Sequence, residues 1–469
     1  MNSGFLPFCC TIAVGRWAVL IQTIIVRRHQ NLHTPTLKQR ALLLFEYDWD
    51  ATGFAGLAND FTMTREGFDL FEFPDNARLL WFNIESFVDR LISQHKAAPM
   101  AAVVSNHEQF GTLAAALYAQ KTGLVGPSPA SIVACQHKLM MRQCMDKVAP
   151  QANIAYRVLD CAIGDKPPVL QDFPRFIKPI KAAYSVLART CNSQQDLDEL
   201  IRFSWHEQFI INKLVAPFER ISHALFPHLP SAHQMVVEEA VQAEQFNLDG
   251  YVYQGKAHLV GVVDELMYPG TQAFMRFHYP SSLPSDVQDQ ALAIAQALLT
   301  EVGFDNAFFN MEFFYDRATK RLSVIEFNPR LGSQLADLYR RVDGVDVYRM
   351  QMALALGHDP ATVSKTLTNF SCAASFVFRR FDHAPAPTAL TAQRKTRLAE
   401  QFPTSDLIEF RKSGVGLARE YKWLGSHRYG VLHLEGRDLK DLKLRFANAC
   451  AVLDWPEGPQ WESAQGGSS

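Results

Sequence analysis

The sequence predicts a multidomain protein that combines α/β and α+β units, and three observations support this fold class. The chain has 469 residues, enough for roughly three or four structural units. From about residue 37 to about residue 128, short apolar runs alternate with helical periods, which is typical of a parallel sheet in a three-layer α/β unit. Further along, longer helices and strand pairs joined by turns replace this alternation, and the pattern changes again after Gly357.

The first part of the chain has the most regular pattern. The predicted strands are 41–45, 68–71 and 100–104, and the predicted helices are 79–93 and 112–121. Residues 123–128, rich in glycine and proline, predict a strand end and a turn. His107 and Glu108 come shortly after the third strand, so they are candidate pocket residues, with helix capping or packing as the alternative.

The middle and the end of the chain predict a different organisation. The predicted helices are 136–148, 194–225 and 287–302, and the predicted strands are 175–179, 235–239, two within 246–263, 308–315, 322–327, 373–381 and 429–434. The two strands within 246–263 meet at Gln254 and Gly255, and the last two predicted strands belong to a smaller α+β unit. The tail from Trp461 has the composition of a disordered segment.

Composition excludes several functional classes. The formal net charge is −2, so no field of either sign favours nucleic acid or an anionic membrane as partner. None of the 8 cysteines forms a C-x-x-C pair or lies at zinc spacing with histidine, which indicates buried thiols in a reducing compartment. No G-x-G-x-x-G follows the first strand, which argues against a nicotinamide-dependent oxidoreductase. We therefore expect a cytoplasmic protein.

The first 30 residues are apolar between Phe5 and Val26, apart from Arg16 and a few polar residues. A signal peptide carries its positive charge before the apolar run, whereas Arg27 and Arg28 follow it here. A membrane span tolerates a residue such as Arg16 poorly near its centre. We expect a packed first helix or strand, or a start codon assigned too far upstream, and keep membrane anchoring as the alternative.

The strongest chemical signal is a pair of strands that each carry a glutamate. If 308–315 and 322–327 pair antiparallel through a loop of about five residues, Glu312 lies opposite Glu326 and Asn310 opposite Asn328. Two carboxylates facing each other among apolar neighbours repel, and ionised pairs in such surroundings are costly. A divalent cation removes the conflict, because carboxylate and amide oxygens are ligands that magnesium takes together with substrate phosphates. The alternative is another register that leaves one glutamate exposed.

These residues resemble the metal-binding hairpin of ATP-grasp enzymes, whose late motif reads E-x-N-x-R. The resemblance implies Glu312, Glu326 and Asn328 as ligands of Mg²⁺, with Mn²⁺ as an alternative, held against the phosphates of ATP. It implies Arg330 as the residue that stabilises charge on a phosphate or an acyl phosphate. The fold implied is an ATP-grasp fold with a Rossmann-like α/β domain before it and an α+β subdomain after it.

Two lysines precede the hairpin in the order that the family would have. Lys138 resembles the helix lysine of ATP-grasp proteins, and Lys178, in Ile-Lys-Pro, resembles the lysine before the flexible phosphate loop. Taken alone, both would be solvated surface charges. The loop after Lys178 departs from the family pattern because it has no glycine, although Ser185 is in reach of phosphates as a candidate ligand.

Residues 235–241 resemble the adenine hinge between the two lobes of the family. The resemblance implies that the main-chain carbonyl of Glu238 and the amide of Val241 read the adenine edge, with Glu239 next to them. Gln245 stands where the family often has a ribose-binding glutamate. The alternative is a plain strand with a solvated glutamate pair. Arg276, between hinge and hairpin, is the candidate arginine for substrate or transition state, with a loop salt bridge as the alternative.

The resemblance implies a division of the chain into successive parts. These are an extension (1–36), a pre-ATP-grasp α/β domain (37–135), a small lobe with a helical insertion (136–235), a large lobe with the metal site (236–358), a C-terminal α+β subdomain (359–460) and a disordered tail (461–469). The four matching motifs lie within 136–357, so the resemblance is most specific there.

The function implied is an ATP- and magnesium-dependent ligase that activates a carboxylate as an acyl phosphate for attack by an amine. Both substrates would be small molecules, and homodimerisation is an expectation at family level only. Two alternatives remain open: a small-molecule kinase that releases the phosphorylated product, and a non-catalytic nucleotide-binding protein with a decayed site. The sequence names neither the acid nor the amine.

Overall fold

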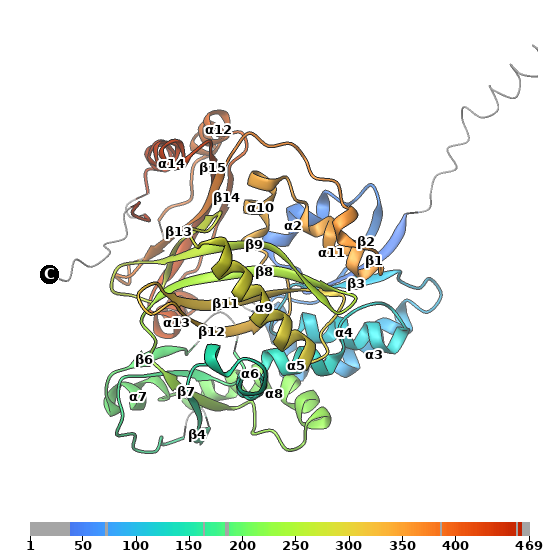
Figure 1. The fold of residues 1–469 in the computed structure, drawn as a ribbon, viewed down its shortest axis with the longest axis vertical. Helices are drawn as coiled ribbons and strands as arrows, with labels where there is room; N and C mark the ends of the chain where they lie inside the picture. Colours follow the sequence, from blue (N-terminus) through green and yellow to red (C-terminus); the bar gives the residue numbers. More distant parts are fainter. Residues whose placement is uncertain are drawn as a thin grey trace, which may run out of the picture. The chain divides into compact units, whose positions relative to one another are not determined.

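The computed structural model describes residues 38–70, 74–162, 165–182, 187–384, 387–455 and 458–461 (Figure 1). The chain divides into two units, 1–39 and 40–469, and the fold below is that of the second unit. Predictions on the apolar N-terminal run, on Ser185 and on the tail beyond Trp461 lie outside the described residues. Within the described part, no helix combines the length and the apolar character needed to cross a membrane.

The N-terminal sheet has three strands in the order β2 (Phe61–Glu66), β1 (Gln39–Leu44) and β3 (Ala102–Val104). Strands β1 and β3 run parallel, with Ala41 opposite Ala102, as the alternating pattern predicted. The helices of this region are α2 (Asp48–Ala55), the 3₁₀ helix η1 (Asp75–Trp81), α3 (Ile84–Gln94), α4 (Gly111–Thr122) and α5 (Pro129–Gln136). The apolar residues of β1 and β3 are buried, which explains why both strands could be predicted from apolar runs.

Two local predictions were wrong, and one helix was not predicted. The second strand is Phe61–Glu66 instead of 68–71, because this edge strand is largely polar and gives little apolar signal. The predicted helix 79–93 is interrupted, since Asn83 begins a new helix by accepting a hydrogen bond from the Ser86 amide. Helix α5 was missed, although Ser128 at its N-cap and Pro129 at its first position are a recognisable start signal.

A four-stranded sheet follows, in the order β4 (Tyr156–Ala162), β7 (Gln234–Glu239), β5 (Arg175–Pro179) and β6 (Arg189–Cys191). Between β6 and β7 the chain forms α7 (Gln194–Leu200) and α8 (Trp205–Leu225). The sequence predicted one mostly helical segment over 194–225. A capping box of Ser204 and Glu207 starts α8 and explains the interruption.

The largest sheet has eight strands, and every neighbouring pair in it is antiparallel. Its order is β12 (Arg321–Asn328), β11 (Ala307–Asp316), β8 (Glu244–Tyr253), β9 (Lys256–Met267), β10 (Phe274–Tyr279), β13 (Cys372–Arg380), β15 (His427–Gly436) and β14 (Asp406–Glu409). The strands after residue 359 therefore continue the sheet that holds the glutamate hairpin. They also have an apolar core cluster of their own, which includes Phe376, Leu432 and Phe446.

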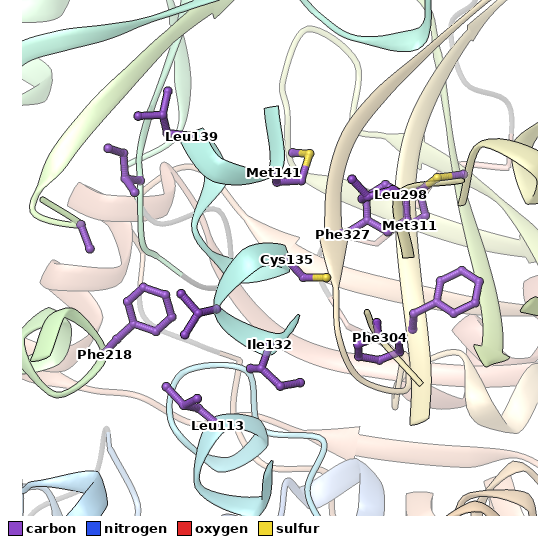
Figure 2. Close-up of a cluster of buried hydrophobic side chains, with 14 of the residues drawn as sticks. Leu113, Ile132, Cys135, Leu139, Met141, Phe218, Leu298, Phe304, Met311 and Phe327 are labelled. Atoms are coloured by element: carbon purple, nitrogen blue, oxygen red, sulfur yellow. The ribbon is translucent and has the colours of Figure 1, made fainter. Parts of the chain in front are cut away.

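Helices cover these sheets. They are α6 (Lys138–Val148), α9 (Ser285–Glu301), α10 (Ala336–Asp343), α11 (Val347–Ala355), α12 (Ala392–Gln401), α13 (Gly414–Leu424) and α14 (Leu439–Leu453), with a short 3₁₀ turn η3 (Pro360–Thr362) and another, η2 (Pro150–Ala152). Figure 2 shows the core in which α5, α6, α9 and the hairpin meet, with Cys135, Met141, Leu298, Met311 and Phe327 among its buried side chains. This core places α6 directly beside β12.

A buried carboxyl group joins α2 to the segments that follow β3 and that form α11. The side chain of Asp50 is fully buried, and its Oδ1 accepts hydrogen bonds from Asn106 Nδ2 at 2.9 Å and Tyr348 Oη at 3.0 Å. Its Oδ2 has no hydrogen-bond partner among the described residues. Burial raises the pKa of Asp50 to about 6, against 3.8 in its ordinary surroundings.

Replacing Asp50 by asparagine is expected to stabilise the protein more at pH 8 than at pH 4.5. The native carboxyl group holds its proton up to about pH 6, whereas the unfolded one releases it near 3.8, so stability is lost as pH rises through this window. Above it, the ionised form costs up to about 3 kcal/mol, which a neutral amide avoids. Thermal unfolding of both proteins at the two pH values measures this, and an equal difference at both would contradict the prediction.

Candidate active site

The glutamate hairpin has the predicted register. Glu312 of β11 lies opposite Glu326 of β12, and Asn310 lies opposite Asn328. The register shifts by one residue immediately beyond Glu312, so that Phe313 pairs with Val324 and Ile325 bulges from the ladder. On its other side, β11 pairs with β8. The glutamates therefore share a sheet face with polar residues of a third strand.

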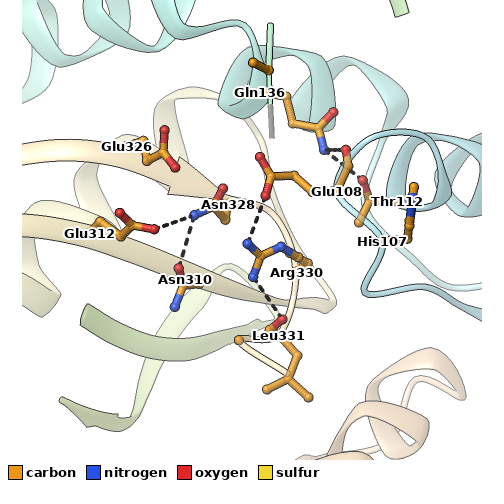
Figure 3. A network of polar contacts seen from close by, with 12 residues as sticks. His107, Glu108, Thr112, Gln136, Asn310, Glu312, Glu326, Asn328, Arg330 and Leu331 are labelled. Atoms are coloured by element: carbon orange, nitrogen blue, oxygen red, sulfur yellow. Dashed lines mark hydrogen bonds and ion pairs between the residues drawn. The ribbon is translucent and has the colours of Figure 1, made fainter. Parts of the chain in front are cut away.

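Side-chain amides connect the oxygen atoms of this face (Figure 3). The Nδ2 of Asn328 donates to Asn310 Oδ1 at 3.2 Å and to Glu312 Oε1 at 3.4 Å. The other oxygen of Glu312 accepts from Gln245 Nε2 at 3.4 Å. Deeper in the sheet, Asn310 Nδ2 donates to Asp249 Oδ1 at 2.9 Å. The result is a continuous layer of hard oxygen atoms held at defined positions.

The carboxylates of this layer repel one another. Burial and the negative charges of Glu326 and Glu265 raise the pKa of Glu312 well above its ordinary value. Burial also raises the pKa of Glu265 to about 7, although Asn247 donates a hydrogen bond to it at 3.1 Å. Carboxylate and amide oxygens that repel in this way fit a divalent cation, which would neutralise the charge and order the ligands. Glu312, Glu326 and Asn328, which lie together on this face, are the candidate ligands.

The two predicted lysines both reach this hairpin. Lys138, at the start of α6, has its Nζ 3.4 Å from Glu326 Oε2 and donates to the Ala182 carbonyl at 3.0 Å. Lys178, at the end of β5, lies 3.0 Å from Glu238 Oε2 and donates to the Ile325 carbonyl at 3.1 Å. Burial opposes the charge of Glu326, yet the two lysines hold its pKa below the ordinary value. The alternative of two solvated surface lysines is excluded, since both are buried.

Strand β7 carries the residues that resemble the adenine hinge, and the side chain of Glu238 belongs to the same cluster as the two lysines. Glu238 pairs with Tyr156 on one side and Phe176 on the other, and its carboxylate is buried against Lys178. The alternative of a solvated glutamate pair is therefore wrong for Glu238. Glu239 remains partly exposed, with Arg321 at 3.7 Å. Val241 follows the end of β7 at Glu239, and Gln245 lies on β8.

Arg142 belongs to this cluster, although it was not predicted as a site residue from the sequence. Its side chain is fully buried, and its Nε lies 2.8 Å from Glu238 Oε1. It follows Lys138 by four residues, so both point to the same side of α6. That spacing was the available signal.

Arg330 forms an ion pair that the sequence reading did not predict. Its guanidinium lies 2.9 Å from Glu108 Oε2, as Figure 3 shows, and Glu108 is buried. The main chain of Glu108 is held as well: its carbonyl accepts from Gln136 Nε2 at 2.8 Å and from Lys181 Nζ at 3.1 Å. Burial lowers the pKa of Lys181 to about 7. The guanidinium of Arg330 is therefore paired with a carboxylate of the protein itself.

His107 has the capping role that the sequence left as an alternative. Its Nδ1 accepts hydrogen bonds from the amides of Phe110 at 3.3 Å and Gly111 at 3.4 Å, at the start of α4. Burial lowers the pKa of His107 to about 3, so the ring is neutral near pH 7. The ring also lines a cavity beside Phe45 and Tyr47, so His107 has both of the positions that the sequence left open.

Arg276 is not brought to this cluster. Its partner on β9 is Leu266, the neighbour of Glu265, so the side chain of Arg276 points to the opposite face of the sheet. Its guanidinium donates to the Trp461 carbonyl at 2.9 Å and lies over the Trp461 ring at 4.4 Å. Arg276 therefore fits neither of its two predictions, a substrate arginine or a loop salt bridge. Its side chain binds the C-terminal segment at Trp461.

The loop after Arg330 requires a glycine. A Cβ on Gly332 would lie 2.8 Å from both carboxylate oxygens of Asp249, and the Gly332 amide donates to Asp249 Oδ1 at 3.2 Å. Asp249 also accepts from Tyr339 Oη at 2.7 Å. This close contact ties the loop to the oxygen layer and orients Arg330.

A second group of metal-ligand residues, Asp337, Asp406 and His433, lies elsewhere in the described part. Asp337 is already paired with Arg340, Arg341 and His433. Charge compensation by arginines makes this an ion-pair network and not a metal centre.

Comparisons with known proteins agree with this geometry. A family model described as an ATP-grasp domain matches residues 171–337, which include Lys178, the hinge and the hairpin. The chain contains an ATP-grasp domain. Most proteins with this domain are ATP-dependent ligases, and ATP-grasp domains bind ATP with Mg²⁺. No curated protein sequence matches the chain significantly.

Solved structures show that the ATP-grasp fold extends over most of the chain. The L-amino acid ligase from Bacillus licheniformis is 12% identical with a TM-score of 0.65, and the match covers 89% of this chain and 98% of that one. N5-carboxyaminoimidazole synthase from Aspergillus clavatus, solved with ADP, is 12% identical with a TM-score of 0.59, covering 89% and 99%. Phosphoribosylglycinamide synthetase from Anaerococcus prevotii is 12% identical with a TM-score of 0.57, covering 88% and 98%. At such identity these likenesses establish the fold and no substrate.

Proposed function

We propose that the protein is an ATP- and magnesium-dependent ligase that converts a small carboxylate to an acyl phosphate and transfers the acyl group to an amine. The observation that carries this proposal is the pairing of Glu312 with Glu326 beside two buried lysines. This arrangement is suited to phosphoryl transfer, which needs fixed charge and positioning more than a covalent nucleophile. The ligases among the similar folds support the choice of acyl chemistry.

Magnesium, when bound, would neutralise the phosphate charge and bring the terminal phosphate into line for attack. Glu312, Glu326 and Asn328 would hold it. Lys138 and Lys178 would bind phosphate oxygens from the side of α6 and β5, with Ser185 as a further candidate from the loop. The main chain at Glu238 and Val241 would read the adenine edge with Glu239 beside them, and Gln245 would contact the ribose. Closure around these groups would keep water from the acyl phosphate.

Arg330 and Glu108 divide the substrate binding between them. In the structure the guanidinium of Arg330 is occupied by a carboxylate, that of Glu108 at 2.9 Å. A substrate carboxylate, and then the acyl phosphate, would replace Glu108 on Arg330. The released carboxylate of Glu108 would bind the ammonium form of the amine and accept its proton, so that the free nitrogen attacks the acyl phosphate and phosphate leaves. This exchange accounts for a buried ion pair that would otherwise cost stability.

The proposal is tested by measuring ADP release from Mg·ATP with a panel of small carboxylic acids, each with and without primary amines. We expect ADP formation that requires both an acid and an amine, and none with Glu326→Ala. Mg·ATP should raise the melting temperature of the wild type and not of Glu326→Ala, because a ligand that binds only the native state stabilises it. ADP formation with an acid alone and release of a phosphorylated product would indicate a kinase. A thermal shift without turnover would indicate a nucleotide-binding protein.

A further inference from the structure

Arg142 makes contacts that go beyond one ion pair. In addition to Glu238, its guanidinium donates to Asn153 Oδ1 at 3.0 Å, to the Val324 carbonyl at 2.6 Å and to the Ile325 carbonyl at 3.0 Å. The side chain is fully buried, so these bonds replace all of its hydration. One residue of α6 thus joins the hinge strand β7 to the strand that carries Glu326.

The contacts of Arg142 lie at the irregular part of β12, where its pairing with β11 is interrupted. This strand is the edge of the eight-stranded sheet, so the carbonyl groups on its outer side have no neighbouring strand to bind. Ile325 is the bulged residue, directly before Glu326. A bulge at an edge can change the direction of the side chain that follows it. The bonds from Arg142 to the carbonyls of Val324 and Ile325 fix the main chain at this position.

Lys178 and Arg142 share their partners. Both lie against the carboxylate of Glu238, at 3.0 and 2.8 Å, and both donate to the Ile325 carbonyl. A buried carboxylate with two cations can release one of them and remain compensated. Lys178 is therefore able to turn towards a phosphate while Arg142 keeps both Glu238 and the bulge in place.

We propose that Arg142 is a positioning residue for the metal site: it holds the bulge of β12, and with it the carboxylate of Glu326, and it keeps Glu238 paired when Lys178 binds a phosphate. This inference rests on the proposed nucleotide and magnesium site. A purely structural role is the competing explanation, and Arg341 is an example of a buried arginine with such a role. Arg341 is also buried and is paired with Asp337 and Glu435, but it lies on α10, outside the cluster.

The test compares Arg142→Met, Arg142→Lys and the control Arg341→Met. The readout is binding of a non-hydrolysable ATP analogue by calorimetry over a range of Mg²⁺ concentrations, beside the melting temperature of each protein. Both methionine variants are expected to melt lower than the wild type. Only Arg142→Met should need about 10-fold more Mg²⁺ for half-maximal binding, because replacing a residue that orients metal ligands commonly weakens metal binding by about this factor. Arg142→Lys should lie between, since one amine can replace part of the guanidinium.

Three outcomes separate the possibilities. If Arg142→Met and Arg142→Lys bind the analogue with the Mg²⁺ requirement of the wild type, the positioning role is overturned. If Arg142→Met does not fold, Arg142→Lys decides alone, and an unchanged Mg²⁺ requirement overturns the role. If the wild type itself does not bind Mg²⁺ with the analogue, the proposed function fails, and this is visible before any variant is examined.

Discussion

Replacing Glu312 by glutamine is expected to abolish magnesium-dependent ADP formation and, at the same time, to raise the melting temperature of the ligand-free protein. Glu312 faces Glu326 across the ladder and lies near Glu265, so its negative charge is repelled from two sides. A neutral amide removes this repulsion and keeps the shape of the side chain, and this gain should outweigh the loss of one of the two long hydrogen bonds, at 3.4 Å, that Asn328 and Gln245 donate. The same change removes a metal ligand, and we expect ADP formation to fall by at least about 100-fold.

The prediction is specific because the same substitution should raise the melting temperature and lower ADP formation. Wild type and Glu312→Gln would be compared by thermal unfolding without ligand and then with Mg·ATP, beside ADP formation. Glu301→Gln, on the surface helix α9 and paired with Lys147, is the matched control and should leave ADP formation unchanged. A lower melting temperature for ligand-free Glu312→Gln would show that the carboxylates of the layer do not repel. Normal turnover would remove Glu312 from the metal site.

The hairpin could be predicted from the sequence because its determinants are local. Alternation along each strand, the short loop and the apolar neighbours together define which residues face each other. The pairing of Glu312 with Glu326 and of Asn310 with Asn328 confirms that register. The bulge at Ile325 could not be predicted, because nothing in the spacing distinguishes a regular ladder from one with an extra residue.

The contacts that surround the hairpin come from distant parts of the chain. Arg142 and Val324 are separated by 182 positions, and Glu108 and Arg330 by 222. A sequence pattern carries no information on such pairs, since Arg142, Glu108 and Arg330 each resemble an ordinary surface charge and a main-chain carbonyl leaves no signal. Arg276 illustrates the reverse error, because a charged residue between two motifs was expected in the site although the register of β10 turns it to the other face. The residues of the hairpin could be predicted from the local sequence, whereas the partners of the buried charges could be identified only from the folded structure.

The division of the chain shows the same limit at a larger scale. The predicted boundary at residue 359 follows a change of pattern after Gly357, and the residues beyond it do have a separate apolar core. Strand β13 nevertheless pairs with β10, so that the sheet of the large lobe continues into the C-terminal part. Apolar periodicity predicts that a segment is a strand, but it does not say which edge that strand extends.

Replacing Arg330 by methionine is expected to destabilise the protein by about 3 kcal/mol and to lower ADP formation by about 100-fold or more. Glu108 is buried, and the change leaves its carboxylate without the guanidinium at 2.9 Å. Adding Glu108→Gln to Arg330→Met should restore most of the stability, because the buried charge is then gone. It should not restore activity, since neither the acyl phosphate nor the amine would have its partner.

This double-mutant cycle separates the two roles of the ion pair. Urea unfolding of the wild type, the two single variants and the double variant measures the coupling between the side chains, and ADP formation with an acid and an amine measures their use in catalysis. If the double variant were as unstable as Arg330→Met, the carboxylate of Glu108 would not be the cause of the loss. If it regained turnover, Arg330 would serve only to neutralise Glu108. If the double variant regains stability but not activity, the ion pair is not needed for folding, and catalysis needs both side chains. This is the result expected if Arg330 and Glu108 separate from each other and bind the two substrates.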